Sequence, residues 1–489
     1  MSRLPLLFIS ILTFCSGALL LSLNGCGGSG SSTAPVTPPS PASKIQHVVI
    51  IFQENRTPDN LFHDQKLINA GADIAVSGVN SKGETIPLSQ IDLGTAGNNP
   101  DNYDLDHSHG AFVSMYDNGK MQGADLISVS CQAGATGCPP PNPQFMYVNP
   151  ADVQPYFTMA EQYTFADRMF QTNQGPSFPA HQFIISGTSA PTATSSAFAA
   201  DNPTGVPGGV AGCIASPAET VAMIDPSGSE SDPMYPPMYP CFEHPTLTDL
   251  LDNANNTWRY YAPSAGSIWT APNAIQHMCG PNAPPPNATA CVGSDWTGTA
   301  PKVVLNQAEN NAEILTDIAN NQLAQVTWVI PDAQDSDHAS VNNGCGPSWV
   351  TLVVNAIGNS PYWSNTAIII AWDDWGGWYD HVPPPAVIND GTSWGSGYVY
   401  GFRVPMIVMS PYAKPAYISH VTHDFGSILK FIETTFDLPS LGYADVPADD
   451  LSDIFNFTQT PIVFQPITPP SNTTQCISDP SPPGDPDDD

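Results

Sequence analysis

Basic residues are scarce in this chain of 489 residues. Lysine and arginine together number 12, against 45 aspartate and glutamate residues, so the formal net charge is −33 and the pI is about 4.2. Nucleic-acid binding needs a basic surface patch, and this composition therefore argues against it. Only 12% of the residues are charged, so the imbalance comes from missing cations. Such a surface approaches neutrality in acid, which favours an acidic working environment.

The cysteines lack the short double spacing that marks a zinc ribbon. Setting aside Cys15 and Cys26 leaves eight, an even set that indicates disulfides in an exported protein. Neighbours in the sequence suggest three bridges and leave one further pair, although other connectivities stay open. The suggested pairs are Cys131–Cys138, Cys213–Cys241, Cys279–Cys291 and Cys345–Cys476.

The amino terminus is typical of an export signal. Arg3 precedes an apolar run from Leu4 to Leu23, and Leu-Asn-Gly-Cys26 ends it. We interpret residues 1–25 as a lipoprotein-type signal peptide, with lipidated Cys26 attaching the protein to a membrane of the cell envelope, in the periplasm or on the outer surface. Residues 26–43 would be a flexible tether rich in Gly, Ser, Thr and Pro. Ordinary secretion and a retained membrane anchor are the alternatives.

Short apolar runs alternate with helical patterns over residues 44–467. Predicted strands are Val48–Phe52, Phe183–Ile185, Trp258–Tyr261, Val326–Ile330, Ala367–Ala371 and Val404–Met409. Predicted helices are Ala308–Asn320, Trp349–Ile357 after the N-cap candidate Ser348, and Phe425–Phe436 after the N-cap candidate Asp424. This alternation predicts one α/β catalytic domain with a mostly parallel sheet between layers of helices.

Four segments between these elements are rich in Pro, Gly, Ser and Asn and hold six of the cysteines. They are 64–99, 131–150, 190–245 and 264–301. Long loops of this kind are functional or disordered, and the cysteines favour order. We predict that they form a disulfide-pinned cap over the sheet edge. Residues 468–489 are predicted to be a disordered acidic tail.

Oxygen ligands follow two of the predicted strands. Glu54-Asn55 comes after the first buried run, and Asp373-Asp374 comes after the run at Ala367–Ala371. Ligand sites in open α/β sheets lie beyond the carboxyl ends of the strands. Adjacent carboxylates repel each other unless a cation or donors compensate. A hard divalent metal ion, of unknown identity, is therefore predicted there, although a polar turn would also explain Glu54-Asn55.

Ser177 is the candidate nucleophile. It lies in Asn173-Gln-Gly-Pro-Ser-Phe-Pro-Ala-His181, where two prolines restrict the backbone around one hydroxyl. A metal-bound serine alkoxide could attack phosphorus without a partner base. The alternative is an ordinary helix N-cap.

Histidines are few, and three occur beside other candidate segments. His107 lies in Asp104-Leu-Asp-His-Ser-His109, His277 precedes Cys279, and His338 follows Trp328-Val-Ile-Pro-Asp332. Imidazoles can bind phosphate oxygens or protonate a leaving group. Surface or packing roles are the alternative for each.

Together these motifs resemble the bacterial phosphoesterase family of phospholipases C and acid phosphatases. The resemblance spans roughly Lys44 to Leu441 and rests on five ordered segments: Gln53-Glu-Asn-Arg56, Gly175-Pro-Ser-Phe-Pro179, Trp328-Val-Ile-Pro-Asp332, Asp373-Asp-Trp-Gly-Gly-Trp-Tyr-Asp-His381, and Gly401-Phe-Arg-Val-Pro405 through Ser427–Glu433. It implies an alkaline-phosphatase-like fold with a covalent, metal-dependent mechanism. Glu54, Asn55, Asp373, Asp374 and Ser177 would bind the metal, Ser177 would also be the nucleophile, and His107, His277 and His338 would line the phosphate pocket.

These observations predict an exported phosphoric ester hydrolase acting on a phosphate ester or a phospholipid. A serine nucleophile, where the other branch has threonine, resembles the acid-phosphatase branch of this family, and the acidic composition favours the same reading. Phospholipase C is the first alternative. A catalytically inactive surface binding protein is the second. The oligomeric state is left open.

Overall fold

The structure is a computed structural model that describes residues 44–94, 103–131, 135–206, 209–225, 228–230, 233–305, 313–339, 344–386 and 400–470. The predicted signal peptide and tether, together with Cys15 and Cys26, lie outside the described residues. So do Cys476 and residues 471–489 of the predicted tail.

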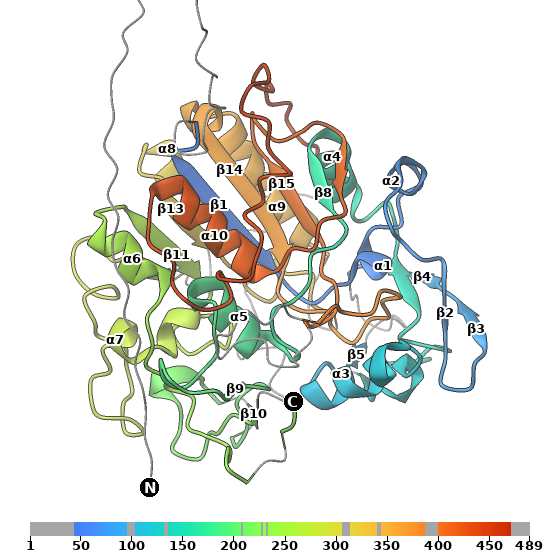
Figure 1. The fold of residues 1–489 in the computed structure, drawn as a ribbon, viewed down its shortest axis with the longest axis horizontal. Coiled ribbons are helices and arrows are strands. Elements are labelled where there is room, and N and C mark those ends of the chain that lie inside the picture. Colours follow the sequence, from blue (N-terminus) through green and yellow to red (C-terminus); the bar gives the residue numbers. More distant parts are fainter. Residues whose placement is uncertain are drawn as a thin grey trace, which may run out of the picture. The chain divides into compact units, whose positions relative to one another are not determined.

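An eight-stranded sheet in the order β12-β11-β13-β1-β14-β15-β8-β16 organises the described chain (Figure 1). Its neighbouring strands are parallel except for β15, which runs antiparallel to both β14 and β8. This confirms the predicted α/β class with a mostly parallel sheet. The strands are β1 His47–Gln53, β8 Thr164–Ala166, β11 Trp258–Ala262, β12 Val303–Leu305, β13 Val326–Val329, β14 Thr366–Trp372, β15 Met406–Met409 and β16 Tyr417–Ser419.

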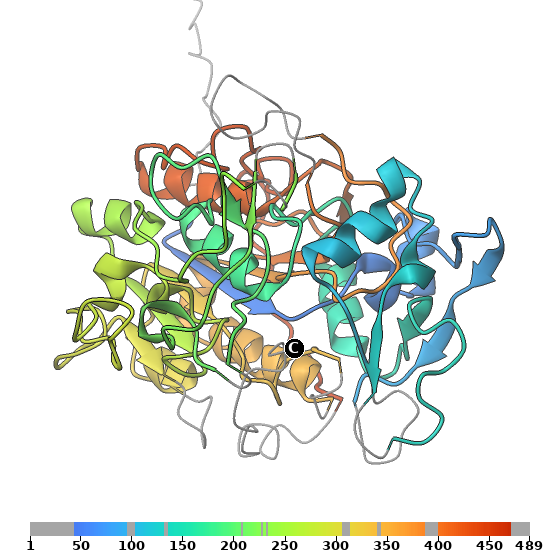
Figure 2. The same ribbon diagram turned by 90° about the horizontal axis from the view of Figure 1, so that it is seen from below.

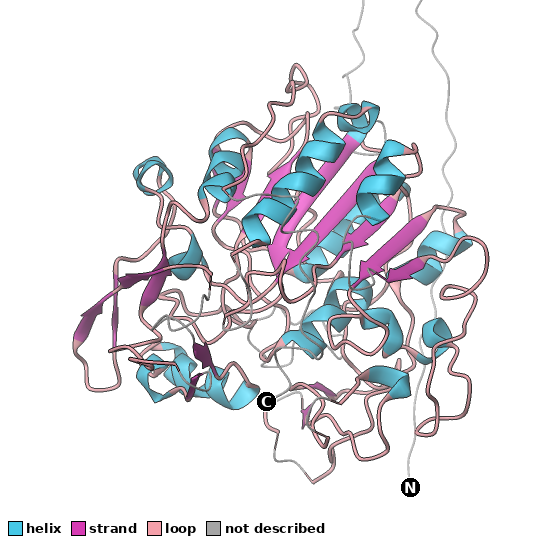
Figure 3. Cartoon of the chain, turned by 180° about the vertical axis from the view of Figure 1, so that it is seen from behind, coloured by secondary structure: helices cyan, strands magenta, loops and turns pink. Residues whose placement is uncertain are grey.

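Helices cover both faces of this sheet. Helices α5 and α10 pack together on one face, whereas α4, α8 and α9 pack together on the other (Figures 1 and 3). Figure 2 shows the same layers from below, with α10 and α9 on opposite sides of β1. The helices are α1 Pro58–Leu61, α2 Gln65–Ala70, α3 His109–Tyr116, α4 Gln154–Gln162, α5 Ser177–Ser186, α6 Leu247–Asn253, α7 Gln276–Cys279, α8 Glu313–Ala319, α9 Gly346–Gly358 and α10 Phe425–Phe436.

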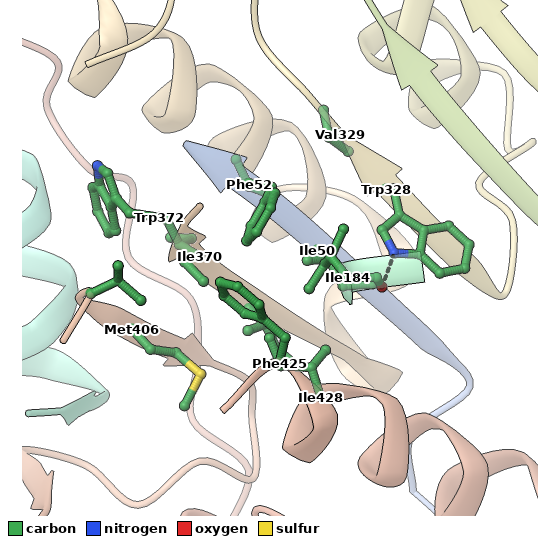
Figure 4. Packing of buried hydrophobic residues seen from close by; sticks show 14 of the residues in the cluster. Ile50, Phe52, Ile184, Trp328, Val329, Ile370, Trp372, Met406, Phe425 and Ile428 are labelled. Carbon is green, nitrogen blue, oxygen red and sulfur yellow. Dashed lines mark hydrogen bonds between the residues drawn. The ribbon is translucent and has the colours of Figure 1, made fainter. Parts of the chain in front are cut away.

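The core lies between the sheet and these helices. Phe425 and Ile428 of α10 face Ile50 of β1 and Ile370 of β14 (Figure 4). Strand β14 is buried at every position, and β1 at every position after His47, as expected for central strands with helices on both sides. Burial of each Val, Ile or Phe side chain on these strands contributes about 1.5–3 kcal/mol.

Two details of the predicted secondary structure were wrong. Residues 183–185 are not a strand but the last turns of α5, whose ten residues are all buried. A helix buried on every side has no solvent-exposed polar face, so a short apolar run within it is not distinguished from a strand by periodicity. Ser348 does not cap α9, because this helix begins at Gly346 with Pro347 in its first turn. The predicted cap Asp424 does accept a hydrogen bond from the Ser427 amide.

The loop-rich segments carry small two-stranded sheets and the disulfides. Bridges join Cys131 to Cys138, Cys213 to Cys241 and Cys279 to Cys291, which confirms these three predicted pairs. Cys345 is also disulfide-bonded. The strand pairs are β2 Ser77–Val79 with β3 Thr85–Pro87, β4 Ser89–Ile91 with β7 Met146–Val148, β5 Tyr103–Leu105 with β6 Val129–Cys131, and β9 Phe198–Ala199 with β10 Met223–Ile224. None of the helices described has both the length and the apolar character to cross a membrane.

Arg403 is fully buried and joins segments that follow different strands. Its guanidinium donates to both carboxylate oxygens of Asp380 and to Oδ1 of Asp59. His381 extends the network, since its Nδ1 lies 2.7 Å from Asp59 Oδ2 and its Nε2 lies 3.0 Å from Asp73 Oδ1. Removing one partner would leave a buried charge unpaired, at a cost of about 3–5 kcal/mol. The network therefore anchors the loop that follows β14.

This network predicts a pH dependence of stability. Burial alone would lower the pKa of His381, but the hydrogen bond and charge of Asp59 outweigh it and raise the pKa from 6.5 to about 9. Its contribution is therefore complete below about pH 6.5 and is lost as the pH rises through 9. We expect the free energy of unfolding to fall by up to about 3 kcal/mol over this window, relative to His381→Gln.

Urea unfolding of the wild type, His381→Gln and His420→Gln across this pH range tests the expectation. His420 pairs with Asp167 from an exposed position. Exposed ion pairs contribute only about 0–1 kcal/mol, so its variant should follow the wild type. Parallel pH profiles for the wild type and His381→Gln would contradict the assignment.

Candidate active site

The pairing of β1 with β14 brings the two predicted ligand pairs together. The strands are parallel and in register from His47 opposite Thr366 to Gln53 opposite Trp372. Glu54 and Asp373 therefore follow adjacent strand ends, and the Asp373 amide donates to the Gln53 carbonyl at 2.8 Å. The loop after β1 contacts the loop after β14, because the backbone amide of Asn55 donates a hydrogen bond to Asp373 Oδ1 at 3.0 Å.

Three carboxylates meet at this point, from Glu54, Asp373 and Asp374, and all three are fully buried. The amides of Asp374 and Gly376 donate to Asp373 Oδ1 and Asp374 Oδ1, respectively. Asp373 Oδ2, in contrast, is buried and has no hydrogen-bond partner among the described residues. Buried carboxylates are costly unless they are paired or bind a metal ion. The donor set and the orphaned oxygen fit a divalent cation.

Helix α5 presents Ser177 to these carboxylates. The Ser177 Oγ lies 3.2 Å from Glu54 Oε2 and 3.1 Å from Asp374 Oδ2. Pro176 is the N-cap residue, so Ser177 begins the helix. The amino-terminal end of a helix carries partial positive charge and favours a phosphate group.

His181 is a site residue that the sequence analysis missed. It lies one helical turn after Ser177, its Nε2 is 3.1 Å from Glu54 Oε1 and 3.9 Å from Asp373 Oδ2, and it is fully buried. Glu54, His181 and Asp373 offer ligand atoms within 4.8 Å of one another. The spacing of four residues from Ser177 was the available signal, because residues four apart share one helix face.

His107 and His338 approach the same site from other loops. Their Nδ1 atoms lie 2.7 Å from the Leu105 carbonyl and 2.6 Å from the Ala339 carbonyl. The Asn55 side chain lies between these rings and the carboxylates, with Nδ2 3.1 Å from His107 Nε2. Exchanging its amide atoms would let Oδ1 accept from Nε2 of both rings and Nδ2 donate to Glu54 and Asp373, which suits the site without a cation. A cation among the carboxylates would favour the first orientation, in which Oδ1 faces them. Nε2 of each imidazole therefore faces the Asn55 side chain at the edge of the ligand cluster.

The structure does not bring His277 into this cluster. Its ring lies 2.9 Å from Glu243 and 3.3 Å from Asp249, and a third of the side chain is exposed. His277 interacts electrostatically with His244, which contacts Ser186 at the far end of α5 from Ser177. Ten helical residues span about 14 Å, so this geometry gives no support for placing His277 in the phosphate pocket.

His109 is also held away from the ligands. Its ring nitrogens lie beside the carbonyls of Gln174 and Gly228. This geometry favours His107 over its neighbour as the pocket histidine.

An open cleft of about 400 Å³ adjoins the site. Pro176 and His107 form part of its lining, so it reaches both the start of α5 and one of the two pocket histidines. We take this cleft as the approach for substrate. The fold and the site together define an α/β protein. Its buried carboxylates, which could bind a metal ion, surround a serine at the start of a helix.

Comparison with known proteins identifies the family. The model of the Phosphoesterase family matches residues 45–439, so the chain belongs to the Phosphoesterase family. This confirms the resemblance found in the sequence motifs.

Its relatives include several proteins named phospholipase C. The chain is 24% identical over 453 residues to a non-hemolytic phospholipase C of Pseudomonas aeruginosa, covering 84% of this chain and 57% of that protein. It is 28% identical over 287 residues to phospholipase C A of Mycobacterium tuberculosis, covering 53% and 51%. The chain thus spans about half the length of these relatives. A solved structure of a protein in the alkaline phosphatase superfamily from Vibrio parahaemolyticus is similar with a TM-score of 0.35 and 11% identity, covering 85% of this chain and 72% of that one.

Gly376 offers a test of the site geometry. Its φ is +61°, and a Cβ there would lie 2.5 Å from the Asn55 carbonyl oxygen and 2.8 Å from Asn55 Cβ. Asn55 itself has φ +58°, in the left-handed region that most residues avoid. We expect Gly376→Ala to displace Asn55 and to weaken divalent-metal binding at least tenfold by calorimetric titration.

Gly83→Ala is the matched control, because Gly83 has φ +77° and a Cβ there would have no atom within 4 Å. Both variants incur backbone strain of about 1–2 kcal/mol, but only Gly376→Ala should alter metal affinity. Equal metal affinities for both would contradict the close packing of this loop on Asn55.

Proposed function

We propose that this protein is a metal-dependent phosphoric ester hydrolase that acts through a phosphoserine on Ser177. The observation that carries the proposal is the position of Ser177 Oγ between Glu54 and Asp374, at the amino-terminal end of α5. A catalytically inactive binding protein is a weaker candidate, since it would have no need to bury three carboxylates around one hydroxyl.

The proposed metal ligands are Glu54, Asn55 through Oδ1, Asp373, Asp374 and Ser177, and His181 lies close enough to Glu54 and Asp373 to join them. A bound divalent cation would stabilise the charge of the phosphoryl group and make the serine hydroxyl easier to ionise. The identity of the ion is open, because oxygen donors with one imidazole suit several divalent metals.

The chain's own residues then perform the phosphoryl transfer. Ser177 Oγ attacks phosphorus and the phosphorus–oxygen bond to the alcohol breaks. His338, with His107 beside it, would bind the phosphate oxygens and deliver a proton to the departing alcohol. Water attack on the phosphoserine returns free Ser177 and phosphate.

An acid phosphatase is our first candidate for the substrate class. A serine nucleophile and a surface poor in cations favour it, since a strongly acidic surface is repelled by anionic membranes. Phospholipase C is the second candidate, and it is favoured by the names of the relatives. In both candidates Ser177 attacks phosphorus. The substrate is a phosphate monoester in the first and a phosphodiester in the second.

We also propose that the protein is exported and attached to a membrane through a lipid on Cys26. The disulfides support an oxidising compartment, because they persist mainly outside the cytosol. The sequence Leu-Asn-Gly-Cys26 after the apolar run is the support for lipidation.

Metal removal should abolish hydrolysis. We expect chelator-treated protein to lose at least about 100-fold in kcat/KM on p-nitrophenyl phosphate and to regain activity with one divalent ion, since the ion offsets the repulsion of three carboxylates. The same assay, run from acid to mildly alkaline pH, should compare the monoester p-nitrophenyl phosphate with the diester p-nitrophenylphosphorylcholine. A higher rate with the monoester, with its maximum in acid, supports the acid phosphatase. A higher rate with the diester supports phospholipase C. Full activity of metal-free protein would contradict the proposed chemistry.

Loss of the Ser177 hydroxyl should abolish turnover without unfolding the protein. We expect Ser177→Ala to lower kcat by about 10³-fold or more, as for other covalent nucleophiles. Acid quenching of wild-type turnover should trap phosphate on the peptide that contains Ser177.

Ser186→Ala is the control on the same helix. The Ser186 hydroxyl donates to a backbone carbonyl at the other end of α5, so its loss should cost about 1 kcal/mol of stability and little activity. Retained hydrolysis in Ser177→Ala would overturn the nucleophile assignment.

A further inference from the structure

His338 stands on a loop that its own strand does not hold in place. Strand β13 ends at Val329, well before His338, and the chain between them forms neither helix nor strand. In the sheet, β13 lies beside β1, and β1 lies beside β14 (Figure 1). Contacts with the loops after these neighbouring strands therefore decide where the imidazole of His338 lies.

The end of β1 holds the main chain of this loop. The Gln53 side chain donates from Nε2 to the Asp335 carbonyl at 3.0 Å and accepts at Oε1 from the Asp337 amide at 2.9 Å. Arg56 donates from Nε and from Nη2 to the Asp337 carbonyl, at 2.8 Å and 2.6 Å. These four hydrogen bonds fix the backbone immediately before His338.

Arg56 is fully buried, although its hydrogen bonds do not go to a carboxylate. Besides the Asp337 carbonyl, its guanidinium donates to Asn60 Oδ1, and it lies 5.0 Å from the centre of the Trp378 ring. Burial lowers the pKa of Arg56 to about 10, which shows that the cation is costly to keep here. The planar guanidinium can direct two donors to one carbonyl and a third to α1, which the single ammonium group of lysine could not do.

The end of β14 contacts Asp337 as well. Trp372 Nε1 donates to Asp337 Oδ2 at 3.1 Å. Trp372 directly precedes Asp373, just as Gln53 directly precedes Glu54, and the two strands are in register at these positions. The loop after β13 is therefore joined to both of the strand ends that carry the buried carboxylates.

We propose that Gln53 and Arg56 are positioning residues that hold the imidazole of His338 at the edge of the carboxylate cluster. The proposal rests on the proposed function, because it concerns the histidine assigned there to bind phosphate oxygens and to protonate the departing alcohol. Both residues act through the backbone of the loop after β13. Their loss should move His338 but leave the carboxylates in place, because the pairing of β1 with β14 holds these.

The experiment is a double-mutant cycle between Arg56→Met and His338→Ala in the metal-loaded protein. Arg56→Met removes the donors to Asp337 and keeps an unbranched side chain to fill the space. We expect it to lower kcat/KM on phenyl phosphate by at least about tenfold, because a positioned proton donor contributes about 100-fold or more. When His338→Ala is also present, the same change should cost less than about twofold, since no imidazole remains to be positioned.

A second substrate separates positioning of a proton donor from a general structural defect. p-Nitrophenolate is a weaker base than phenolate, so its departure depends less on a proton donor. Arg56→Met should therefore lower kcat/KM on phenyl phosphate at least about fivefold more than on p-nitrophenyl phosphate. A structural defect would lower both values equally. Equal losses on both substrates, or equal losses with and without His338, would overturn the proposal.

Gln53→Met tests the same role if Arg56→Met does not fold. It removes both hydrogen bonds of the Gln53 side chain and leaves those of Arg56, so we expect a smaller loss with the same dependence on His338. Arg259→Met is the control. Arg259 lies on β11 and pairs with Asp317, so its loss removes one cation without removing a hydrogen bond to the loop. Its kcat/KM should equal that of the wild type.

Calorimetric binding provides a readout besides turnover. Affinity for the divalent ion should not fall in Arg56→Met. A fall equal to the loss of turnover would overturn the proposal, because Arg56 would then support the neighbouring ligand Asn55 instead of His338.

Binding of inorganic phosphate separates failure of this proposal from failure of the proposed function. If the wild type hydrolyses no phosphate ester, the proposed hydrolase fails, and the same cycle is measured on phosphate affinity. A loss in Arg56→Met that disappears in the presence of His338→Ala would uphold the positioning role. Additive losses, or no phosphate binding at all, would overturn it.

Discussion

The in-register parallel pairing of β1 with β14 is the constraint on which the site depends. These strands are separated by more than 300 residues in sequence, and each is followed by side chains that repel those of the other. The sheet overrides that repulsion because helices bury both of its faces and hold the strand ends side by side. The repulsion between these carboxylates is unfavourable to folding, but it leaves them preorganised as ligands for a cation.

The surrounding loops are shaped by the same requirement. Asn55 takes a left-handed backbone conformation to place its amide among the carboxylates, and Gly376 lets the second loop approach it. Strained positions of this kind persist when the neighbouring structure fixes them, and they concentrate at functional sites. Farther out, Arg403 and His381 hold the end of the same loop through Asp59. The geometry of the ligand cluster and the stability of the fold are thus linked through the loop after β14.

Much of this arrangement could be predicted from the sequence, because its signals are local. Two β-branched runs, one followed by Glu54-Asn55 and the other by Asp373-Asp374, indicated central strands with a ligand site. The three disulfides described join near neighbours in the sequence. Phe183–Ile185 was misassigned because α5 has no solvent-exposed face, so its apolar run lacks the polar spacing of a surface helix. His181 was missed, and His277 was included, because the sequence does not show which side chains tertiary packing brings together. His181 lies beside Glu54, whereas His277 lies beside Glu243.

The most direct test is a crystal structure of the protein soaked with Mn²⁺, with anomalous scattering to locate the ion. We expect one ion bound by Glu54, Asp373 or Asp374, with the Ser177 Oγ within coordinating distance, about 2–2.5 Å. A well-ordered site without anomalous density at saturating Mn²⁺ and at saturating Zn²⁺ or Ca²⁺, or an ion bound away from Ser177, would contradict a metal-activated serine.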